Sequence, residues 1–552
     1  MTMRHHPVLI VGAGPTGLTA AMELSRLGVP VRLIDKLAAP STTSRALAVQ
    51  ARTLELLQQR GLTDKMLAAG NKASAGSLYG RGKLLGKIDL SRIPGRHNYV
   101  LLLSQAETER LLTEQLQQQG VQIERGVELI GFVQAQPSTP DSGVTAELRH
   151  ADGTIEHMQA AVLISAEGAH SSARHALKLP FEGKSLKPTY ALADLYADGE
   201  IASDQLSIFI SDHGFLAMFP LAQGRFRMIA IEPDADERQD EDSVRDIPAD
   251  PPTLTQLQAI YDAHSPVPAI LSNIVWSSHF RINSRMLQTL RQGNVFFGGD
   301  AAHIHSPAGG QGMNTGIQDM VDLCWKLALV LQGRADAALL DTYERDRLPV
   351  IRNIVTRTEA ATDVLNSRNT LVHRLVTHIA PLALSIDVIQ DTATRLISEI
   401  NIDYRGSPLS VTHDAGGSLH GGDRLPDIDV IAWEHNSSDD ESREGNLYAL
   451  LDPSRLTLLI AQGAAAPILP QDWREQLRPW EAVLTIRHIA AALADGQDRE
   501  FRNLFGSYHL HVARPDCYLG FVGDAARWDA LIAWLEQWFA PGAAQNPFYK
   551  QA

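Results

Sequence analysis

The chain has little cysteine: only Cys324 and Cys517 occur among its 552 residues. Two cysteines exclude a disulfide framework, a CxxC redox pair and a zinc site made of four cysteines. A low count is typical of a reducing compartment, so we expect the protein in the cytoplasm. Because Cys517 stands alone in the last third of the chain, dithiol redox chemistry is excluded there.

Positive charge and long apolar runs are also scarce. Lys and Arg together number 49 against 64 Asp and Glu, and the formal net charge is −15. This balance argues against nucleic acid or an anionic membrane surface as a main partner. No stretch reaches the roughly 18–20 apolar residues that a membrane-spanning helix needs. The apolar start of the chain is interrupted at once by glycine, so we expect no signal peptide.

Length and composition indicate a globular protein of several domains. A single core stops growing near roughly 250–300 residues, and this chain is longer. Its 44% hydrophobic and 20% charged residues are ordinary for such a protein.

A dinucleotide motif lies near the start of the chain. Val8 to Val11 is a continuous apolar run, typical of a buried parallel strand. Gly12-Ala-Gly14-Pro-Thr-Gly17 follows and opens a helix, and the next strand ends in Asp35. Glycines at a helix N-terminus admit a pyrophosphate, and an acidic residue about 20 residues on can bind a ribose hydroxyl. An ordinary glycine turn is the alternative.

A second glycine-rich segment occurs late in the chain. Asn294 to Phe297 reads as a short strand, Gly298-Gly299-Asp300 as a turn, and a buried helix starts after Gly312. Bare backbone N–H groups at that helix start suit an anion or an electron-rich ring. His303 and His305 lie two apart, but no third ligand is near, so we expect packing and hydrogen bonding rather than a metal site.

The middle and the end of the chain differ in character. Strand-like runs dominate from 181 to 282, with a helix at 253–264, so we expect a mostly antiparallel sheet. His213, Phe215 and Met218 are candidates for a substrate pocket there, although each is individually more often a core residue. After Leu331 we expect one helix from 335 to 347 and another from 349 to 365. A break at 404–422 precedes a small α/β domain of about 140 residues.

Two arginines follow the first motif. Arg45, close to the dinucleotide site, is expected to hold a phosphate. Arg52 is expected at a solvated helix start.

Three motifs together carry a family resemblance: GAGPTG near the start, EGAHSSAR in the middle and GGDAAHIHSPAGGQGMN late. The chain resembles the class A flavoprotein aromatic monooxygenases of the p-hydroxybenzoate hydroxylase type. The segment TSRALAVQARTLELL and the C-terminal extension are similar to the larger branch with the phenol, pentachlorophenol, hydroxyphenylpropionate, polyketide and rifampicin hydroxylases. The resemblance covers about residues 7–365 well.

The resemblance implies a mixed α/β fold of three parts. A Rossmann-type FAD-binding domain with a helical extension would span residues 1–180 and 275–400. An antiparallel substrate sheet would span 181–274, with strands added from about 72–104. A thioredoxin-like domain would span 405–552.

It also implies which residues bind FAD. The pyrophosphate loop would be Gly12, Gly14, Pro15, Thr16 and Gly17; the adenosine ribose would lie at Asp35 and Lys36; Leu129 would lie on the strand beside the adenine; Arg45 and Gln105 would contact the flavin side; Asp300 would bind the ribityl chain; and Pro307, Gly312, Met313 and Asn314 would surround the ring.

The middle motif departs from the family pattern, which has Asp-Gly where this chain has Glu167-Gly168. The family's Asp helps to position FAD and NADPH. Because Gly168 and Arg174 remain, we expect the turn to keep its role.

By the same resemblance, NADPH or NADH reduces FAD, and dioxygen then forms a flavin C4a-hydroperoxide that hydroxylates an aromatic or polycyclic phenolic substrate. The flavin carries the chemistry, so we assign no catalytic side chain and no metal. With one dinucleotide motif, NAD(P)H would bind only transiently. The alternatives are a Baeyer–Villiger oxygenase on the same fold, or a flavoprotein whose FAD is structural and which has an interaction role. A monomer or a homodimer is expected.

Overall fold

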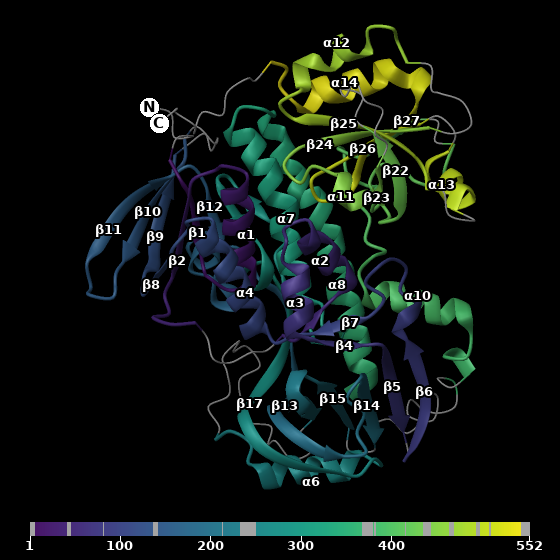
Figure 1. Cartoon of the computed structure of the whole chain (residues 1–552). Coiled ribbons are helices and arrows are strands. Elements are labelled where there is room, and N and C mark those ends of the chain that lie inside the picture. The colour runs from purple at the N-terminus through teal and green to yellow at the C-terminus, as the bar shows by residue number, and fades with distance from the viewer. Residues whose placement is uncertain are drawn as a thin grey trace.

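The computed structural model of the chain describes residues 6–40, 46–80, 82–135, 142–211, 214–231, 250–307, 309–366, 379, 382–413, 416–433, 443–462, 469–492, 497–506 and 509–542. In Figure 1 the C-terminal part lies at the top, the N-terminal α/β part in the middle and a large sheet at the bottom. Among these residues no helix combines the length and apolarity that a membrane crossing requires. The predicted mixed α/β class is confirmed.

A six-stranded sheet forms the N-terminal part, in the order β18-β19-β12-β1-β2-β8. Its strands are parallel except for β18, and β1 is buried along its whole length, which explains its purely apolar sequence. Helices α1 and α7 pack on each other beside this sheet. The bounds are β1 (Val8–Val11), β2 (Val31–Asp35), β8 (Ile123–Arg125), β12 (Leu163–Ser165), β18 (Arg291–Gln292), β19 (Val295–Phe297), α1 (Pro15–Arg26), α4 (Gln105–Gln118) and α7 (Gly312–Leu331).

Two small antiparallel sheets flank this core, in the orders β11-β10-β9 and β3-β7-β4. The hairpin predicted around Asp152-Gly153 is confirmed as β10 and β11. The bounds are β3 (Ala48–Val49), β4 (Asn71–Ala73), β7 (Val100–Leu102), β9 (Glu128–Gln134), β10 (Val144–Arg149) and β11 (Ile155–Ala160), with helices α2 (Ala51–Gln58), α3 (Thr63–Ala69) and α5 (Ser172–Ala176).

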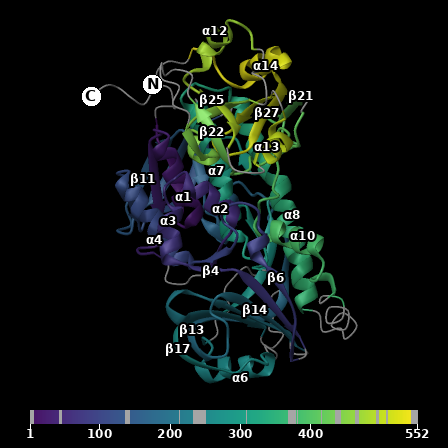
Figure 2. The same cartoon turned by 45° about the vertical axis from the view of Figure 1, so that its right-hand side comes forward.

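The large sheet has eight strands in the order β20-β17-β13-β16-β15-β14-β5-β6, antiparallel except between β14 and β5. The sheet does not end at residue 274 as predicted, because β17 continues to Met286. Of the strands predicted to join it from about 72–104, β5 and β6 do so, whereas β7 belongs to another sheet. Helix α6 covers one face (Figure 2). The bounds are β5 (Ala75–Gly80), β6 (Lys83–Asp89), β13 (Glu182–Gly199), β14 (Gln205–Ser211), β15 (Gly214–Pro220), β16 (Arg225–Ile231), β17 (Ala269–Met286), β20 (His303–Ile304) and α6 (Leu254–His264).

A single long helix, α8 (Asp341–Asn366), runs through Leu348, where the break between the two predicted helices was expected. Pro349 lies inside it. Buried residues before and after the proline, Arg347 and Ile351 among them, continue one packed face through the position where an isolated helix would break. Helix α10 (Asp387–Ile397) then leads toward the C-terminal part.

The C-terminal part holds a seven-stranded mixed sheet in the order β21-β27-β26-β24-β25-β22-β23. Two of its strands are buried along their whole length: β24, which is mostly apolar, and β26, which also carries His509 and His511. Its likeness to thioredoxin stays a prediction. The bounds are β21 (Val411–His413), β22 (Asp429–Trp433), β23 (Arg443–Asn446), β24 (Leu456–Ala461), β25 (Leu484–Ala491), β26 (His509–Ala513), β27 (Leu519–Asp524), α11 (Leu447–Leu450), α12 (Trp473–Leu477), α13 (Gln497–Phe505) and α14 (Trp528–Trp538).

Candidate functional site

The first glycine loop lets backbone pack on backbone. Gly12 has φ +102°, and a Cβ there would lie 2.2 Å from the carbonyl oxygen of Ala166. A Cβ at Gly17 would lie 1.8 Å from the carbonyl oxygen of Gly12. At Gly14, in contrast, a Cβ would meet no atom within 4 Å. Two of these glycines are therefore required by the protein itself, and the third leaves open space at the N-terminus of α1, as a phosphate ligand needs.

Asp35 ends β2 and is bound to this loop. Its Oδ2 accepts a hydrogen bond from the N–H of Ala13 at 2.7 Å, and its Oδ1 accepts one from Leu37 at 2.8 Å. Arg125 Nη1 lies 3.5 Å from the carboxylate, and Lys36 is exposed. A carboxylate fixed beside a glycine loop, with lone pairs left over, fits the binding of a ribose hydroxyl.

Thr16 joins the two glycine-rich segments. A Cβ at Gly299, which has φ +56°, would lie 2.3 Å from Thr16 Oγ1, and a Cβ at Gly316 would lie 2.5 Å from the same atom. The threonine side chain fills the space that both glycines leave free. Exposed Asp300 follows Gly299 directly. We call Gly12–Gly17 together with Gly298–Gly316 the glycine cradle.

Asp319 of α7 is the buried charge that holds the cradle in shape. Its Oδ2 accepts from the N–H of Gly299 at 3.0 Å and lies 2.7 Å from His303 Nε2, and Arg347 Nε donates to its Oδ1 at 2.8 Å. Burial alone would raise the pKa of Asp319, but Arg347 and His303 outweigh it and lower the pKa to about 2. The hydrogen-bonding role predicted for His303 is confirmed.

His305 is held as a neutral ring beside the start of α7. Its Nδ1 lies 3.0 Å from the carbonyl oxygen of Ser306. Burial, together with the neighbouring His303, lowers the pKa of His305 to about 4. Within the residues that the structure describes, no three His, Cys, Asp or Glu side chains are grouped so that they could hold a metal ion.

The loop before α7 is organised by Asn314. Its Nδ2 donates to the carbonyl oxygens of Ala48 and Gly310, both at 2.8 Å, and its Oδ1 accepts from the N–H of Gln50 at 2.9 Å. Gln50 Nε2 in turn donates to Gly309 at 2.8 Å. Since the Asn314 side chain is used inside the protein, this loop would present backbone groups to a ligand. Pro307 is exposed and Met313 is nearly buried beside it.

Glu167 does not extend away from its turn. Its carboxylate accepts hydrogen bonds from the hydroxyls of Ser165 and Ser171, at 2.8 and 2.9 Å, and from the backbone N–H of Ala173 at 3.1 Å. The carboxylate thus caps the short helix α5. Arg174 donates to the carbonyl oxygen of Ala301 at 3.1 Å, which links the middle motif to the turn that carries Asp300. A contact of Glu167 or Gly168 with FAD or NAD(P)H stays a prediction.

Of the remaining predicted cofactor residues, Gln105 lies beside the chain that follows Arg45. Its backbone N–H donates to Ala46 at 3.0 Å, and its Oε1 accepts from Ala46 at 3.3 Å. Arg45 itself lies outside the described residues. Leu129 is a core residue of β9, the strand that starts where Val127 donates to the carbonyl of Asp35 at 3.0 Å. The adenine contact of Leu129 stays a prediction.

The eight-stranded sheet separates the predicted pocket residues. Phe215 lies in an apolar cluster with Tyr190, Leu192 and Ile229 on the face that also contacts α8. Met218 lies three residues along β15, hence on the opposite face, in the core under α6. Its placement argues against a pocket role. His213 lies outside the described residues.

The face with Phe215 also carries a buried ion pair that the sequence did not indicate. Arg227 of β16 bonds Asp194 of β13 through two nitrogens, at 2.7 and 2.8 Å. Arg227 Nη1 also donates to the carbonyl oxygen of Ala46 at 3.1 Å. The sheet is thereby tied to the segment beside the cradle. Asp319, Arg347, Arg227 and Asp194 were all missed because buried charges follow no spacing rule.

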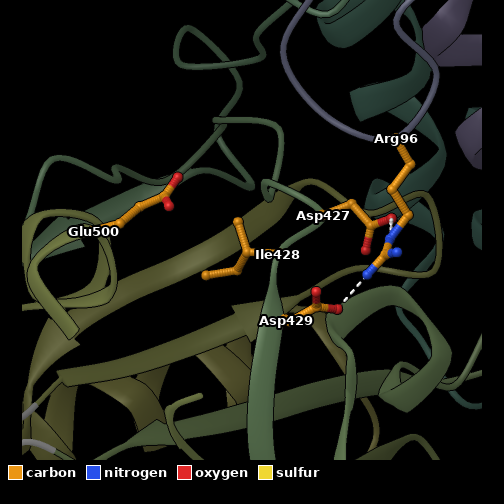
Figure 3. Close-up of a pocket in the computed structure, with 5 residues that line it drawn as sticks. All are labelled: Arg96, Asp427, Ile428, Asp429 and Glu500. Atoms are coloured by element: carbon orange, nitrogen blue, oxygen red, sulfur yellow. Dashed lines mark hydrogen bonds and ion pairs between the residues drawn. The ribbon is translucent and has the colours of Figure 1, made fainter. Parts of the chain in front are cut away.

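Two measurable cavities lie away from the cradle. One of about 240 Å³ is lined by Arg96, Asp427, Ile428, Asp429 and Glu500. Figure 3 shows Arg96 pointing at Asp427 and Asp429, which it pairs with, and Glu500 across the cavity on α13. The other, of about 460 Å³, lies at the N-terminal ends of β2 and β8, whereas open parallel sheets bind ligands at the carboxyl ends of their strands.

The chain is similar to known proteins over nearly its whole length. The family described as FAD binding domain matches residues 5–358. The chain is 34% identical to the 6-methylpretetramide 4-monooxygenase of Streptomyces rimosus, over 98% of this chain and 96% of that one. It is 30% identical to the pentachlorophenol 4-monooxygenase of Sphingobium chlorophenolicum, over 84% and 81%. The solved anhydrotetracycline hydroxylase of Streptomyces rimosus superposes with a TM-score of 0.74, at 27% identity over 97% and 99%.

Proposed function

The chain belongs to the FAD-binding family that matches residues 5–358 and is an FAD-dependent monooxygenase, and we propose that it uses NAD(P)H and dioxygen to hydroxylate an aromatic or polycyclic phenolic substrate. The relatives named above act, by their names, on a pretetramide and on pentachlorophenol. Pentachlorophenol is a phenol by its name, which supports a phenolic substrate class for this chain.

One observation carries the proposal. β20 is the edge strand of the eight-stranded sheet, pairing with β17, and the chain passes from β20 directly into the loop of the cradle before α7. We propose that a ring held at that loop meets the side of the sheet on which Phe215 and Tyr190 form an apolar cluster. Cofactor and substrate would then meet where the two parts of the fold join.

The residues of the cradle fit FAD. The open space at Gly14 would take the pyrophosphate, Asp35 would bind the adenosine ribose, and exposed Asp300 would bind the ribityl chain. When bound, FAD supplies the redox chemistry that no protein side chain can. The N-terminus of α7, a helix of twenty residues, would contribute a positive field that stabilises negative charge on a ring held at Gly312 and Met313.

Protein side chains near the ring hold position rather than move protons. His303 is bonded to Asp319, and the lowered pKa of His305, about 4, leaves it a weak base at neutral pH. We therefore propose that the chain binds, orients and shields the reactants. NAD(P)H would approach transiently, since a single dinucleotide motif is present in the sequence.

The test is substrate-stimulated oxidation of NAD(P)H by the purified flavoprotein, with a panel of simple and polycyclic phenols. We expect one or more of them to accelerate NAD(P)H consumption and to gain one oxygen atom as a ring hydroxyl. A lactone or ester product would instead support the Baeyer–Villiger alternative. FAD that binds but shows no stimulation by any substrate would support a structural cofactor.

Asp300→Ala tests the cofactor placement. Because Asp300 is exposed in the cradle and Asp319 holds the neighbouring Gly299, we expect FAD retention to fall about tenfold or more, with the fold of the apoprotein kept. Equilibrium dialysis against FAD measures the first and thermal unfolding the second. Normal retention would remove Asp300 from the site.

A further inference from the structure

Glu399 occupies an unusual position between α10 and the C-terminal sheet. Only 1% of the residue is exposed, and its backbone has φ +62°, a left-handed conformation that is costly for a residue with a side chain. Such a conformation persists only where the surroundings fix it. We call residues 396–402 the connecting segment.

The connecting segment lies along the outside of the glycine cradle. Gln311 Nε2, just before α7, donates to the carbonyl oxygen of Leu396 at 3.0 Å, and the N–H of Arg52 donates to that of Ser398 at 3.1 Å. Ile400 packs in one apolar cluster with Ala48, whose carbonyl oxygen binds Asn314. The segment therefore supports the strand that organises the cradle loop.

The carboxyl group of Glu399 faces the side-chain amide of Gln318, and each group keeps one buried oxygen without a donor. Glu399 Oε2 accepts from Gln318 Nε2 of α7 at 2.5 Å. Among the described residues, Glu399 Oε1 and Gln318 Oε1 are both buried without a partner. Burying acceptors without donors is unfavourable, and an ionised carboxylate adds a charge to that cost. With the amide turned over, its oxygen faces Glu399 Oε2, and a proton on the carboxyl then supplies the donor between them.

The charged side chains around Glu399 pair with one another. Arg347 of α8 and Asp319 of α7 act on it in opposite senses and pair with each other at 2.8 Å. Glu55 of α2 pairs with Arg52 at 3.0 Å and with Arg424 at 2.9 Å, and Arg424 Nε donates to the carbonyl oxygen of Ile400 in the connecting segment at 3.1 Å. Burial is the largest effect and raises the pKa of Glu399 to about 8. The electrostatics thus agree with the hydrogen-bond geometry.

We propose that Glu399 is a positioning residue for the cofactor: as a neutral carboxylic acid it bonds Gln318 and holds the connecting segment against the cradle. The identity of the cofactor rests on the proposed function, whereas the protonation of Glu399 does not. The two can therefore be tested separately.

The first test is the pH dependence of stability in Glu399→Gln. Between the unfolded pKa of 4.5 and the folded pKa of about 8, the native wild type binds a proton that the unfolded chain does not. Wild-type stability therefore falls as pH rises through this window, by about tenfold in the unfolding equilibrium per pH unit, and the amide variant has no such loss. We expect the melting temperature of Glu399→Gln minus that of the wild type to rise from pH 5 to 8 and then level.

Glu344→Gln is the matched control. Glu344 of α8 also accepts hydrogen bonds from neutral donors, the hydroxyl of Thr289 and the N–H of Leu290, neither of which belongs to the cradle. We expect its melting-temperature difference to stay constant over the same pH range. If the melting-temperature difference for Glu399→Gln is also constant, or shrinks as pH rises, the proposal that Glu399 is a neutral acid is overturned.

The second test is FAD affinity against pH. Wild-type affinity should weaken above pH 8 as Glu399 ionises, Glu399→Gln should keep its affinity throughout, and Glu399→Leu should bind FAD roughly tenfold more weakly at pH 7 because the Gln318 amide loses its partner. If Glu399→Leu does not fold, the comparison of FAD affinity against pH between the wild type and Glu399→Gln still tests the positioning role. Affinities that are independent of pH in the wild type would overturn the positioning role. A chain that binds no flavin at all would overturn the proposed function and leave the melting experiment valid.

Discussion

Helix α7 serves two regions that are built in opposite ways. Its first half belongs to the glycine cradle, where missing side chains make close backbone contacts possible. Its second half contacts the C-terminal part through the C-terminal junction, which consists of Asp322, Lys326, Asp346, Arg514 and Asp516. The cradle depends on glycines that allow close backbone packing, and the junction depends on buried ion pairs.

The junction places more acids than bases out of water. Lys326 Nζ lies 2.8 Å from both Asp322 and Asp346, and Arg514 Nη2 lies 2.7 Å from Asp322 and 3.0 Å from Asp346. Burial and the neighbouring Asp346 raise the pKa of Asp322 in spite of Lys326. Two bases against three acids explain the direction, since one carboxyl that keeps its proton balances the group. In this junction, unlike in the cradle, Lys326 and Arg514 each pair with more than one buried carboxylate.

Loss of Arg514 should therefore have the largest effect on the fold. Arg514→Ala leaves three buried acids with Lys326 alone, and we expect a loss of about 3–5 kcal/mol in unfolding free energy. Arg502→Ala is the control, because Arg502 of α13 pairs with Asp498, both side chains are exposed, and such a pair is worth about 1 kcal/mol or less. Thermal and denaturant unfolding measure both. Equal losses would mean that the junction is no different from a surface ion pair.

The cradle should respond to added volume instead. Gly17→Ala places a Cβ against the Gly12 carbonyl, so we expect roughly 3 kcal/mol of lost stability together with weak FAD binding. Gly14→Ala meets no protein atom, so it should leave the apoprotein melting temperature unchanged and still lower FAD affinity. Melting curves with and without FAD separate the two. If Gly14→Ala binds FAD normally, the open space beside it is not the pyrophosphate site.

The contrast also explains what the sequence could predict. Glycines act on their immediate neighbours, so GAGPTG and GGDAAHIHSPAGGQGMN reveal their turn, strand and helix locally. Arg52 shows the opposite case. It was expected at a solvated helix start, but it is fully buried, because the C-terminal part covers it and Asp516 accepts its hydrogen bond at 2.6 Å. Nothing near Arg52 in the sequence indicates a partner more than four hundred residues away.

Local patterns likewise could not give the faces of the large sheet. Phe215 and Met218 are both apolar strand residues, and which face meets α6 depends on how eight strands pair. The same holds for Pro349, where packing on both sides outweighs a local helix-breaking tendency.

Asp319→Asn tests the buried carboxylate that binds the cradle at Gly299. Its lowered pKa, about 2 against an ordinary 3.8, stabilises the fold above pH 4, and this contribution is lost as pH falls from about 4 to 2. We expect the variant to lose roughly 2 kcal/mol at pH 7, since asparagine can still accept from Gly299 but cannot pair with Arg347. Acid unfolding monitored by circular dichroism should show the two proteins converging at low pH. A difference that persists at pH 2 would show that the charge of Asp319 is not what stabilises the cradle.

The smallest expected effect concerns the two faces of the large sheet. One face carries Phe215, and the other packs under α6. Phe215→Leu removes part of the aromatic face toward α8, and we expect KM for the phenolic substrate to rise about two- to fivefold with FAD affinity unchanged. Met218→Leu conserves volume in the core under α6, so it should cost less than about 1.5 kcal/mol and leave KM unaltered. Steady-state kinetics of the paired variants compare the faces directly, because the residues lie three apart on one strand and differ mainly in the side that they occupy. An equal change of KM in both would mean that the effect travels through the stability of β15 rather than through contact with the substrate, and the substrate would then have to be placed elsewhere than on the Phe215 face.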